Sequence, residues 1–293
     1  MTDIEVALHA KAIIGEAPTW SAEENALYWI DIKKPALHRF VPASAALRTW
    51  DLTSDIGAFA LCRDDAAVVA MRNGIYHLTL KNGALELLAP PPFDPELFRF
   101  NEGICDDTGR FWIGVMFDPV HPGRAAEHSS LHSFTFDGGL RREDDEAELH
   151  NGMAIDVDRS RFFLSHSREG KIFVFDFDAA NGRIGGRKEF AAVPCALGIP
   201  DGAALDQDGC YWCAIHGGGR IHRYARDGSL DRSILLPVTQ PTMCAFGGQD
   251  LETLYVTSAS DGVPDEALAG SVFQLRPGVR GIRRHCHMLR GSN

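Results

Sequence analysis

Four oxygen-bearing side chains recur along this sequence, each beside a small turn-forming residue and each at the start of a short apolar run. They are Glu16 in GEAPTW, Asn101 in NEGICD, Asn151 in NGMAID and Asp201 in PDGAALD. Two carboxylates meeting in one place would repel each other unless a cation lay between them. Carboxylate and amide oxygens without histidine or cysteine favour calcium, magnesium or manganese over structural zinc. The set therefore indicates a hard divalent ion, provided that the fold brings the four together.

The elements that must position these residues are short strands in a loose repeat. Six runs rich in aromatic and β-branched residues follow turns, and their second apolar positions are separated by 40, 43, 51, 49 and 43 residues. Those positions are Trp29, Val69, Trp112, Phe163, Trp212 and Tyr255. Each run is followed by another alternating, strand-like segment, with turn signals such as DDTG and DQDG between them. Six such repeats with three or four strands each predict an all-β, six-bladed β-propeller with four-stranded blades.

Closing such a ring requires a fourth strand for the last blade. The segment IEVALH at 4–9 precedes the innermost strand of the first blade and has nothing else to pair with. We expect it to form the outer strand of the last blade, which removes exposed sheet edges by joining the two chain ends. Residues 1–293 are then expected to form a single propeller domain.

The four polar residues occupy matched places in this repeat. They lie 13, 11, 12 and 11 residues before the aromatic position of their own run. The first strand of each blade lines the central channel of a propeller, so these side chains are expected to meet at one channel mouth. The competing interpretation is that Asn-Gly, Asp-Gly and Gly-Glu only form the turns that lead into strands. A turn does not require the carboxylate of Glu16, which favours the metal site.

Composition narrows the possible partners. The formal net charge is -11 and the Lys and Arg residues are dispersed, so nucleic acid or an anionic membrane would meet like charge over much of the surface. No apolar run approaches the ~20 residues of a membrane span, and MTDIEVALHAK lacks a signal-peptide core. Seven cysteines without framework spacing are typical of reduced thiols. We expect a cytoplasmic protein, either a monomer or a weak homodimer, with neither nucleic acid nor membrane as a partner.

At this point the chain resembles a known family, the SMP-30/gluconolactonase/luciferin-regenerating-enzyme group of regucalcin-like propellers. The resemblance covers essentially the whole chain. It rests on GEAPTW followed by LYWIDI, RFNEGICDDTGRFWIGVM, NGMAIDVD, PDGAALDQDGCYWCAIHGGGRIHRY and FGGQDLETLYVTSA. Members of this family characteristically hydrolyse sugar lactones to aldonic acids, so the resemblance implies a sugar lactone as the small-molecule partner.

The resemblance also implies roles for particular residues. Glu16, Asn151 and Asp201 would be the protein ligands of one catalytic divalent cation, with calcium preferred and magnesium, manganese or zinc as alternatives. Asn101 would lie beside the ion, and Arg99 would bind substrate oxygens. An extended segment places Arg99 on the same side as Asn101, two residues later.

Several positions depart from the family pattern and carry the remaining candidate substrate contacts. Glu102 stands where aspartate usually follows the asparagine, and Asp118 in FDPVHPG is a candidate replacement for an acidic contact of some relatives. His166 in LSHS replaces a common aspartate, and His216 in AIHGGGR replaces a larger aromatic residue. For each histidine, a structural role competes with substrate binding. The substrate is therefore less determined than the reaction.

The expected reaction is metal-assisted hydrolysis of a cyclic ester. The ion would polarise the carbonyl, Asp201 would accept a proton from water as the catalytic base, and Glu16 would remain chiefly a ligand. No Gly-x-Ser-x-Gly motif occurs, which argues against an acyl-serine route. Two alternatives stay open: hydrolysis of organophosphates or aryl esters with the same metal, and a non-enzymatic calcium-binding or scaffold propeller.

Overall fold

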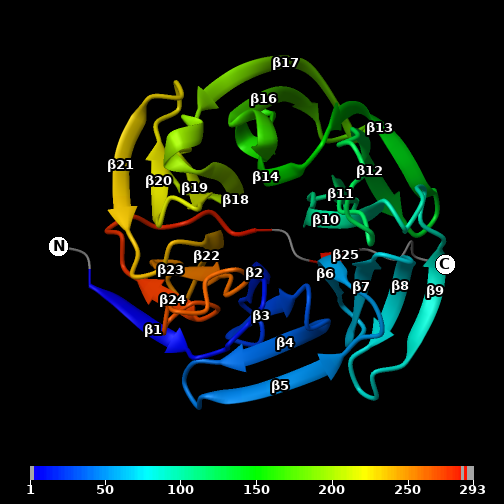
Figure 1. The fold of residues 1–293 in the computed structure, drawn as a ribbon, viewed down its shortest axis with the longest axis horizontal. Coiled ribbons are helices and arrows are strands. Elements are labelled where there is room, and N and C mark those ends of the chain that lie inside the picture. Colours follow the sequence, from blue (N-terminus) through cyan, green and yellow to red (C-terminus); the bar gives the residue numbers. More distant parts are fainter. Residues whose placement is uncertain (1–2, 285–286, 289–293) are drawn as a thin grey trace.

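The chain folds into six β-sheets arranged as the blades of a ring (Figure 1). The structure, a computed structural model, describes residues 3–284 and 287–288. The innermost strand of each blade lies toward the centre of the ring, and later strands follow outward to the rim (Figure 1). The predicted six-bladed propeller is confirmed.

The first two blades are built in chain order from the channel to the rim. Blade 1 consists of β2 (Gly15–Ser21), β3 (Ala26–Asp31), β4 (Ala36–Val41) and β5 (Ala46–Asp51). Blade 2 consists of β6 (Ile56–Cys62), β7 (Ala66–Met71), β8 (Gly74–Thr79) and β9 (Leu85–Ala89). The short β25 (His287–Met288) adds to the inner edge of blade 2, parallel to β6.

The next two blades contain two short 3-10 helices and the longest strands. Blade 3 consists of β10 (Phe98–Cys105), β11 (Phe111–Phe117), β12 (Ser129–Thr135) and β13 (Gly139–Ala147). Blade 4 consists of β14 (His150–Asp156), β15 (Arg161–His166), β16 (Lys171–Asp178) and β17 (Arg183–Ala192). Helix η1 (Val157–Arg159) joins β14 to β15, and η2 (Ser167–Glu169) joins β15 to β16.

The last two blades lead back to the start of the chain. After η3 (Cys195–Leu197), blade 5 consists of β18 (Ile199–Leu205), β19 (Tyr211–His216), β20 (Arg220–Tyr224) and β21 (Leu230–Leu235). Blade 6 consists of β22 (Pro241–Gly247), β23 (Thr253–Ser258), β24 (Val272–Leu275) and, at its rim, β1 (Ile4–Leu8). Ile4 pairs with Leu275, so the ring closes through the N-terminal strand as predicted.

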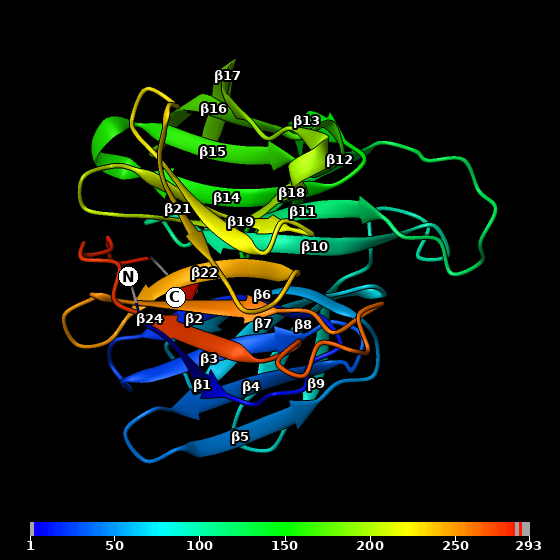
Figure 2. The ribbon, with the colours of Figure 1, turned by 60° about the vertical axis from the view of Figure 1, so that its left-hand side comes forward.

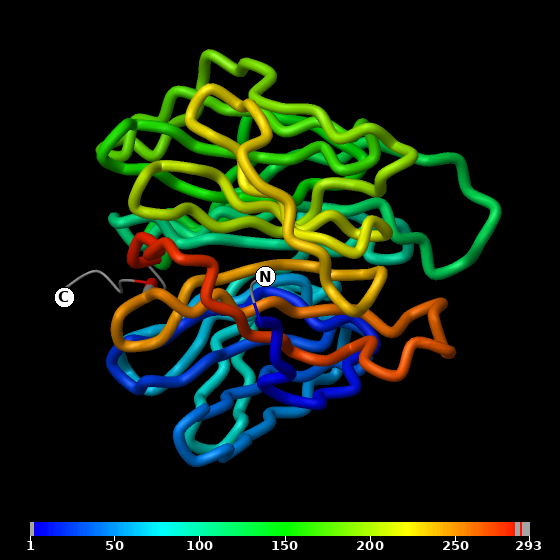
Figure 3. The backbone as a smooth tube through the Cα atoms, turned by 90° about the vertical axis from the view of Figure 1, so that its left-hand side faces the viewer, coloured from blue at the N-terminus to red at the C-terminus, as the bar shows by residue number. Residues whose placement is uncertain are grey.

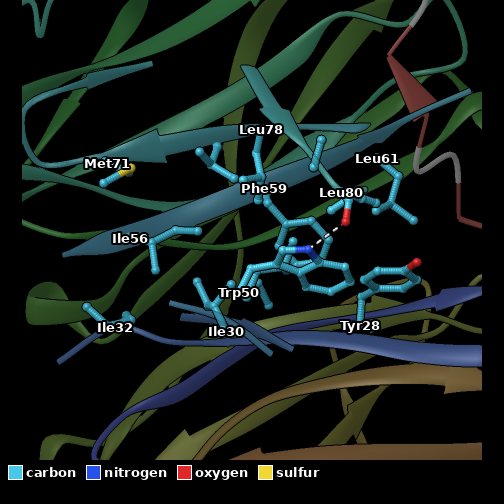
Figure 4. Packing of buried hydrophobic residues seen from close by; sticks show 14 of the residues in the cluster. Tyr28, Ile30, Ile32, Trp50, Ile56, Phe59, Leu61, Met71, Leu78 and Leu80 are labelled. Carbon is cyan, nitrogen blue, oxygen red and sulfur yellow. Dashed lines mark hydrogen bonds between the residues drawn. The ribbon is translucent and has the colours of Figure 1, made fainter. Parts of the chain in front are cut away.

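Apolar side chains between neighbouring blades hold the ring together. Between blades 1 and 2, the rings of Tyr28, Trp50 and Phe59 pack in one buried cluster (Figure 4). The indole Nε1 of Trp50 donates to the carbonyl of Leu80 in the next blade, 2.8 Å away. Trp50 is the single buried residue of β5, whose other side chains are exposed. The innermost strands β6 and β10 are buried along their whole length, whereas β5 at the rim buries one residue.

The C-terminal segment lies at one end of the channel, where the innermost strands finish. Figure 1 shows it crossing from blade 6 toward β25, and Figure 3 shows it at the far side from the loop between β11 and β12. Ile282, Arg283 and Arg284 line a cavity of about 60 Å³ there, together with the last residues of the inner strands. Arg284 Nη2 donates to the carbonyl of Gly103 at 2.7 Å. The opposite end of the channel, where the inner strands begin, is the one that carries the polar residues.

Long connections rise around that opposite end. The segment 118–128, between β11 and β12, extends well beyond the blades (Figure 2). It starts where the second strand of blade 3 finishes, beside the beginning of β10. Within the part of the chain that the structure describes, no helix has the length and apolarity needed to cross a membrane.

Candidate active site

The four matched polar residues line one cavity of about 190 Å³ at the channel mouth. Glu16, Asn101, Asn151 and Asp201 come from blades 1, 3, 4 and 5, at or near the starts of their innermost strands. Blade 6 contributes Thr242. The structure thus brings together side chains that are far apart in sequence, as their matched places in the repeat predicted.

An irregularity in each inner strand aims these side chains into the channel. The pairing register shifts in the innermost strand of all six blades, and in four of them the shift begins at or one residue before a matched polar residue. The residues that follow Glu16 and Asn151 have positive φ, 51° at Ala17 and 62° at Gly152. A bulge bends the strand and redirects the side chain beside it. The small residues next to the polar ones therefore serve this backbone shape.

The two carboxylates that line this cavity, Glu16 and Asp201, are buried together, and nearby positive charge does not balance their negative charge. Burial, then the charge of Glu102, raises the pKa of Glu16 to about 8. Burial, then the charges of Glu16 and Glu102, raises the pKa of Asp201 well above its usual range. Arg99 and Arg284 act in the opposite direction on Glu16 but do not offset the effect. A divalent cation between Glu16 and Asp201 would remove this repulsion, so the residues present fit such an ion.

A one-way chain of hydrogen bonds sets the orientation of the two asparagines. Arg99 Nη1 donates to Asn101 Oδ1 at 2.7 Å, and Asn101 Nδ2 donates to Asn151 Oδ1 at 2.7 Å. Asn151 Nδ2 donates to Ser167 Oγ at 3.1 Å, and Ser167 Oγ donates to the carbonyl of Pro200 at 2.6 Å. A guanidinium can only donate and a carbonyl can only accept, so neither amide can be reversed. Asn151 Oδ1 keeps a second lone pair, which is available to a cation.

Glu102 lies beneath the cavity and not on its wall. Its two carboxylate oxygens accept hydrogen bonds from the backbone amides of Gly152 and Met153, at 2.5 and 2.7 Å. Burial raises the pKa of Glu102 to about 7, although these hydrogen bonds and the charge of Arg284 oppose the shift. Glu102 therefore holds the bulge that follows Asn151 in the neighbouring blade.

Arg99 and Asp118, two candidate substrate contacts, belong to one ionic cluster. Arg99 lines the cavity, and its Nε donates to Asp118 Oδ2 at 3.0 Å. Asp118 Oδ2 also accepts hydrogen bonds from Lys33 Nζ, at 2.9 Å, and from Arg72 Nη2. Burial alone would raise the pKa of Asp118, but Arg99, Lys33 and Arg72 outweigh it and lower the pKa to about 2. Asp118 does not line the cavity and instead anchors Arg99 from outside.

The two candidate histidines lie in different surroundings. His216 is on the wall of the cavity, and its pKa is lowered first by burial and then by the charge of Arg168. His166 is buried behind the wall, with Nε2 2.7 Å from Asp145 Oδ2 and Nδ1 3.1 Å from Glu169 Oε1. Both ring nitrogens of His166 thus have carboxylate partners, and the ring does not reach the cavity.

His166 is part of a buried group that no sequence pattern predicted. Asp145, His150 and His166 place one ligand-type atom each within 4.8 Å of the others, so this group could hold a metal ion. Their separations in the chain, 5 and 16 residues, match no familiar ligand spacing. Asp145 comes from the rim strand of blade 3, whereas both histidines come from blade 4.

Sequence reasoning also missed three residues around the cavity. Thr242 lies on its wall, and a signal existed, since it precedes Tyr255 by the same 13 residues that separate Glu16 from Trp29. Arg168 lies on the wall with its side chain half exposed, paired with a glutamate at 3.4 Å. Ser167, behind the wall, has no signal, because a buried serine is identified only through its neighbours.

The fold and the cavity together define a six-bladed propeller with a polar site at its channel mouth. A model of the SMP-30/Gluconolactonase/LRE-like region matches residues 14–260, so the chain belongs to this family. The resemblance seen in the sequence is thereby confirmed.

Individual relatives include both a lactonase and regucalcins. The chain is 36% identical over 280 residues to 6-deoxy-6-sulfogluconolactonase of Pseudomonas putida, covering 92% of this chain and 93% of that one. It is 31% identical over 277 residues to regucalcin of Gallus gallus, covering 92% and 93%. Among solved structures, the calcium-binding protein regucalcin from Agrobacterium tumefaciens superposes with a TM-score of 0.89 at 26% identity, over 98% of each chain.

Proposed function

We propose that this protein hydrolyses a sugar lactone to the corresponding aldonic acid with one divalent cation. The observation that carries the proposal is the pair of buried carboxylates, Glu16 and Asp201, that line one cavity. Burial and repulsion from neighbouring carboxylates raise the pKa of each, and a cation between them would relieve that repulsion. The lactonase relative, at 36% identity over nearly the whole chain, supports the same reaction class. Calcium is the preferred ion, because the donors are all oxygen and a regucalcin of the same fold is a calcium-binding protein.

Glu16, Asn151 and Asp201 would hold the ion. When bound, the cation would polarise the lactone carbonyl and stabilise the charge that develops on its oxygen. Asp201 is the base candidate, because its carboxylate lines the cavity in which the ion would be held. It would take a proton from the water that attacks the carbonyl carbon. The ring C–O bond then breaks, and that proton completes the hydroxyl group of the open-chain acid.

The cavity walls supply groups that could orient the ring. Ile14, Ile32 and Leu149 offer apolar surface for its carbon face. Arg99 Nη2 has only the sulfur of Met116 as a partner, at 3.1 Å, among the described residues. Its N–H groups are therefore the donors of Arg99 best placed for a substrate oxygen. Asn101 and His216 on the same cavity wall are further candidate contacts.

A screen of sugar lactones with a pH indicator tests the proposal. The protein is first treated with a chelator and then supplied with calcium, magnesium, manganese or zinc. We expect acid release from at least one lactone, dependent on the added cation. Phosphotriesters and aryl esters are tested alongside, and turnover of those alone would favour the organophosphate or aryl-ester alternative. Cation binding without turnover of any substrate would favour a calcium-binding propeller.

The variant Asp201→Asn separates binding from chemistry. Asparagine keeps the shape and an oxygen, so the bulge should persist, but a charge and a proton acceptor are lost. We expect weaker cation binding in calorimetry and lactone turnover reduced by roughly 100-fold or more at saturating cation. Turnover near that of the wild type at saturation would show that Asp201 is a ligand only. The matched control is Asp227→Asn, an exposed aspartate whose side chain bonds only within its own turn.

A further inference from the structure

The buried group of Asp145, His150 and His166 has the arrangement of a metal site. Asp145 Oδ2 lies 2.7 Å from His166 Nε2 and 3.3 Å from His150 Nε2. The side chains of the three residues are 1%, 0% and 3% exposed. Asp145 Oδ1 is held separately by Arg187 Nη1, at 3.1 Å, which leaves Oδ2 directed at the two imidazoles. One carboxylate oxygen and two ring nitrogens therefore converge on a single point between blades 3 and 4.

The far nitrogens of both rings have acceptors. His166 Nδ1 lies 3.1 Å from Glu169 Oε1. His150 Nδ1 lies 3.1 Å from the carbonyl oxygen of Val115, and the amide N–H of Val115 makes a longer contact with the same nitrogen, at 3.4 Å. A hydrogen bond from Nδ1–H to a carboxylate or carbonyl fixes the tautomer, so that the lone pair of Nε2 faces the opposite way. Metal-binding histidines in proteins are oriented in this manner. When Nδ1 is the donor in both rings, which for His150 is its shorter contact with Val115, both Nε2 lone pairs face the charged Asp145.

That arrangement is repulsive unless positive charge lies among the three atoms. Nitrogen lone pairs at 2.7 and 3.3 Å from a carboxylate oxygen require either a proton or a metal ion between them. A proton on His166 would satisfy that ring. It would leave His150 Nε2 unsatisfied, and this buried atom has no hydrogen-bond partner within the described residues. One metal ion would satisfy all three groups.

We propose that Asp145, His150 and His166 bind a second divalent ion of the zinc type. Two imidazoles and one carboxylate suit zinc or cobalt, whereas the channel-mouth site is made of oxygen alone. Zinc ligands at about 2.0–2.2 Å from the ion lie about 3.3 Å apart in a tetrahedron. The Asp145–His150 separation already meets this, and the Asp145–His166 separation needs to open by roughly half an ångström.

Such an ion would connect two blades close to the channel-mouth site. Asp145 belongs to blade 3 and both histidines to blade 4. The carbonyl of His150 accepts a hydrogen bond from Asn101 Nδ2 at 2.9 Å, and His150 directly precedes Asn151. The second ion would therefore fix the backbone that presents Asn151 and that accepts the hydrogen bond from Asn101. The proposal does not rest on lactonase activity.

Metal stoichiometry tests the proposal. The full-length protein is stripped with a chelator and titrated with zinc, and bound metal is measured by calorimetry and by elemental analysis after dialysis. We expect two equivalents for the wild type. Asp201→Asn weakens the channel-mouth site and should retain one tightly bound equivalent. Cobalt in that variant should give the intense visible absorption of a four-coordinate ion with nitrogen ligands.

His166→Phe identifies the ligand. Phenylalanine keeps the ring contact with Phe173, whose centroid lies 4.7 Å from that of His166, but offers no nitrogen. The variant should lose one zinc equivalent and the cobalt signal. His132→Phe is the matched control, because His132 is also buried but bonds to the carbonyl of Ser130, and it should keep both equivalents. No tightly bound zinc in Asp201→Asn would overturn the proposal even if His166→Phe did not fold.

Discussion

At the scale of single residues, Ser167 determines which atom Asn151 presents to the cavity. Its hydroxyl accepts from Asn151 Nδ2 and donates to the carbonyl of Pro200, and the side chain is completely buried. At the other end of this series of hydrogen bonds, Arg99 donates to Asn101, which in turn donates to Asn151 and so fixes the position of its oxygen. Without the serine hydroxyl, the amide of Asn151 loses the group that keeps its nitrogen away from the ion.

We expect Ser167→Ala to weaken divalent cation binding at the channel mouth by about tenfold or more, because residues that orient metal ligands contribute this much. Turnover at saturating cation should recover, since no reacting group is removed. Calorimetric titration with calcium and activity at rising calcium measure the two effects. Ser165→Ala is the matched control: Ser165 is equally buried but lies 3.4 Å from the hydroxyl of Tyr211 and contacts neither asparagine amide. Equal affinities of the two variants would contradict this role.

Because of the ionic cluster around Asp118, the free energy of unfolding should decrease as the pH becomes acidic. The pKa of Asp118, about 2 in the folded protein, lies below the ordinary aspartate value of 3.8, so its stabilising contribution is present above pH 4 and is lost as the pH falls toward 2. The shift corresponds to on the order of 2 kcal/mol, reduced by the partial exposure of the side chain. Asp118→Asn should therefore lower the free energy of unfolding most above pH 4, and the difference from wild type should narrow toward pH 2. Urea titrations at pH 6, 4 and 3 measure it; a constant difference would exclude this origin.

At the scale of elements, the bulge in β14 is the feature that positions Asn151. Gly152 has a φ of 62°, and a Cβ there would lie 2.3 Å from Ser165 Oγ and 2.4 Å from the hydroxyl of Tyr211. Gly152→Ala should destabilise the protein by about 2–4 kcal/mol, through the backbone conformation and the clash together, and should weaken cation binding.

Gly185→Ala is the control for that substitution, because no atom lies within 4 Å of a Cβ built there and φ is not positive. It should change stability by no more than about 0.5 kcal/mol. Denaturant unfolding of both variants, with calcium titration of the folded proteins, makes the comparison. A stable Gly152→Ala variant with normal calcium affinity would show that the bulge does not position the site.

At the scale of the whole molecule, β1 closes the ring. Ile4 and Val6 pack against the core between blades 5 and 6, and β1 covers the edge of β24. Deleting residues 1–9 should lower the free energy of unfolding by about 2 kcal/mol or more, which lowers Tm by roughly 3 °C, and should promote aggregation through the open edge. Scanning calorimetry and light scattering measure these. The control is Glu5→Ala, which removes only an exposed hydrogen bond to Gln274 and should leave Tm unchanged. If the deletion variant had the same Tm as the wild type, ring closure by β1 would not be a source of stability.

The sequence by itself determined the architecture of this protein. Strand patterns repeat locally, so six runs with similar spacing were enough to predict six blades, and one unpaired segment was enough to predict the closure. The convergence of Glu16, Asn101, Asn151 and Asp201 followed from the same repeat, because matched positions in different blades point to one channel. Their roles in binding and catalysis remain predictions.

Only the tertiary structure decided which side chains meet between blades. Nothing local pairs Asp118 with Lys33, or places Asp145 beside His166, since these contacts join residues of different blades whose separation in sequence carries no pattern. His166 was a candidate for the cavity because it follows an aromatic strand, yet its ring turns to the carboxylates of the neighbouring elements. Repeats specify the backbone, whereas polar contacts between blades depend on how neighbouring sheets pack, and that is settled only when the ring is assembled.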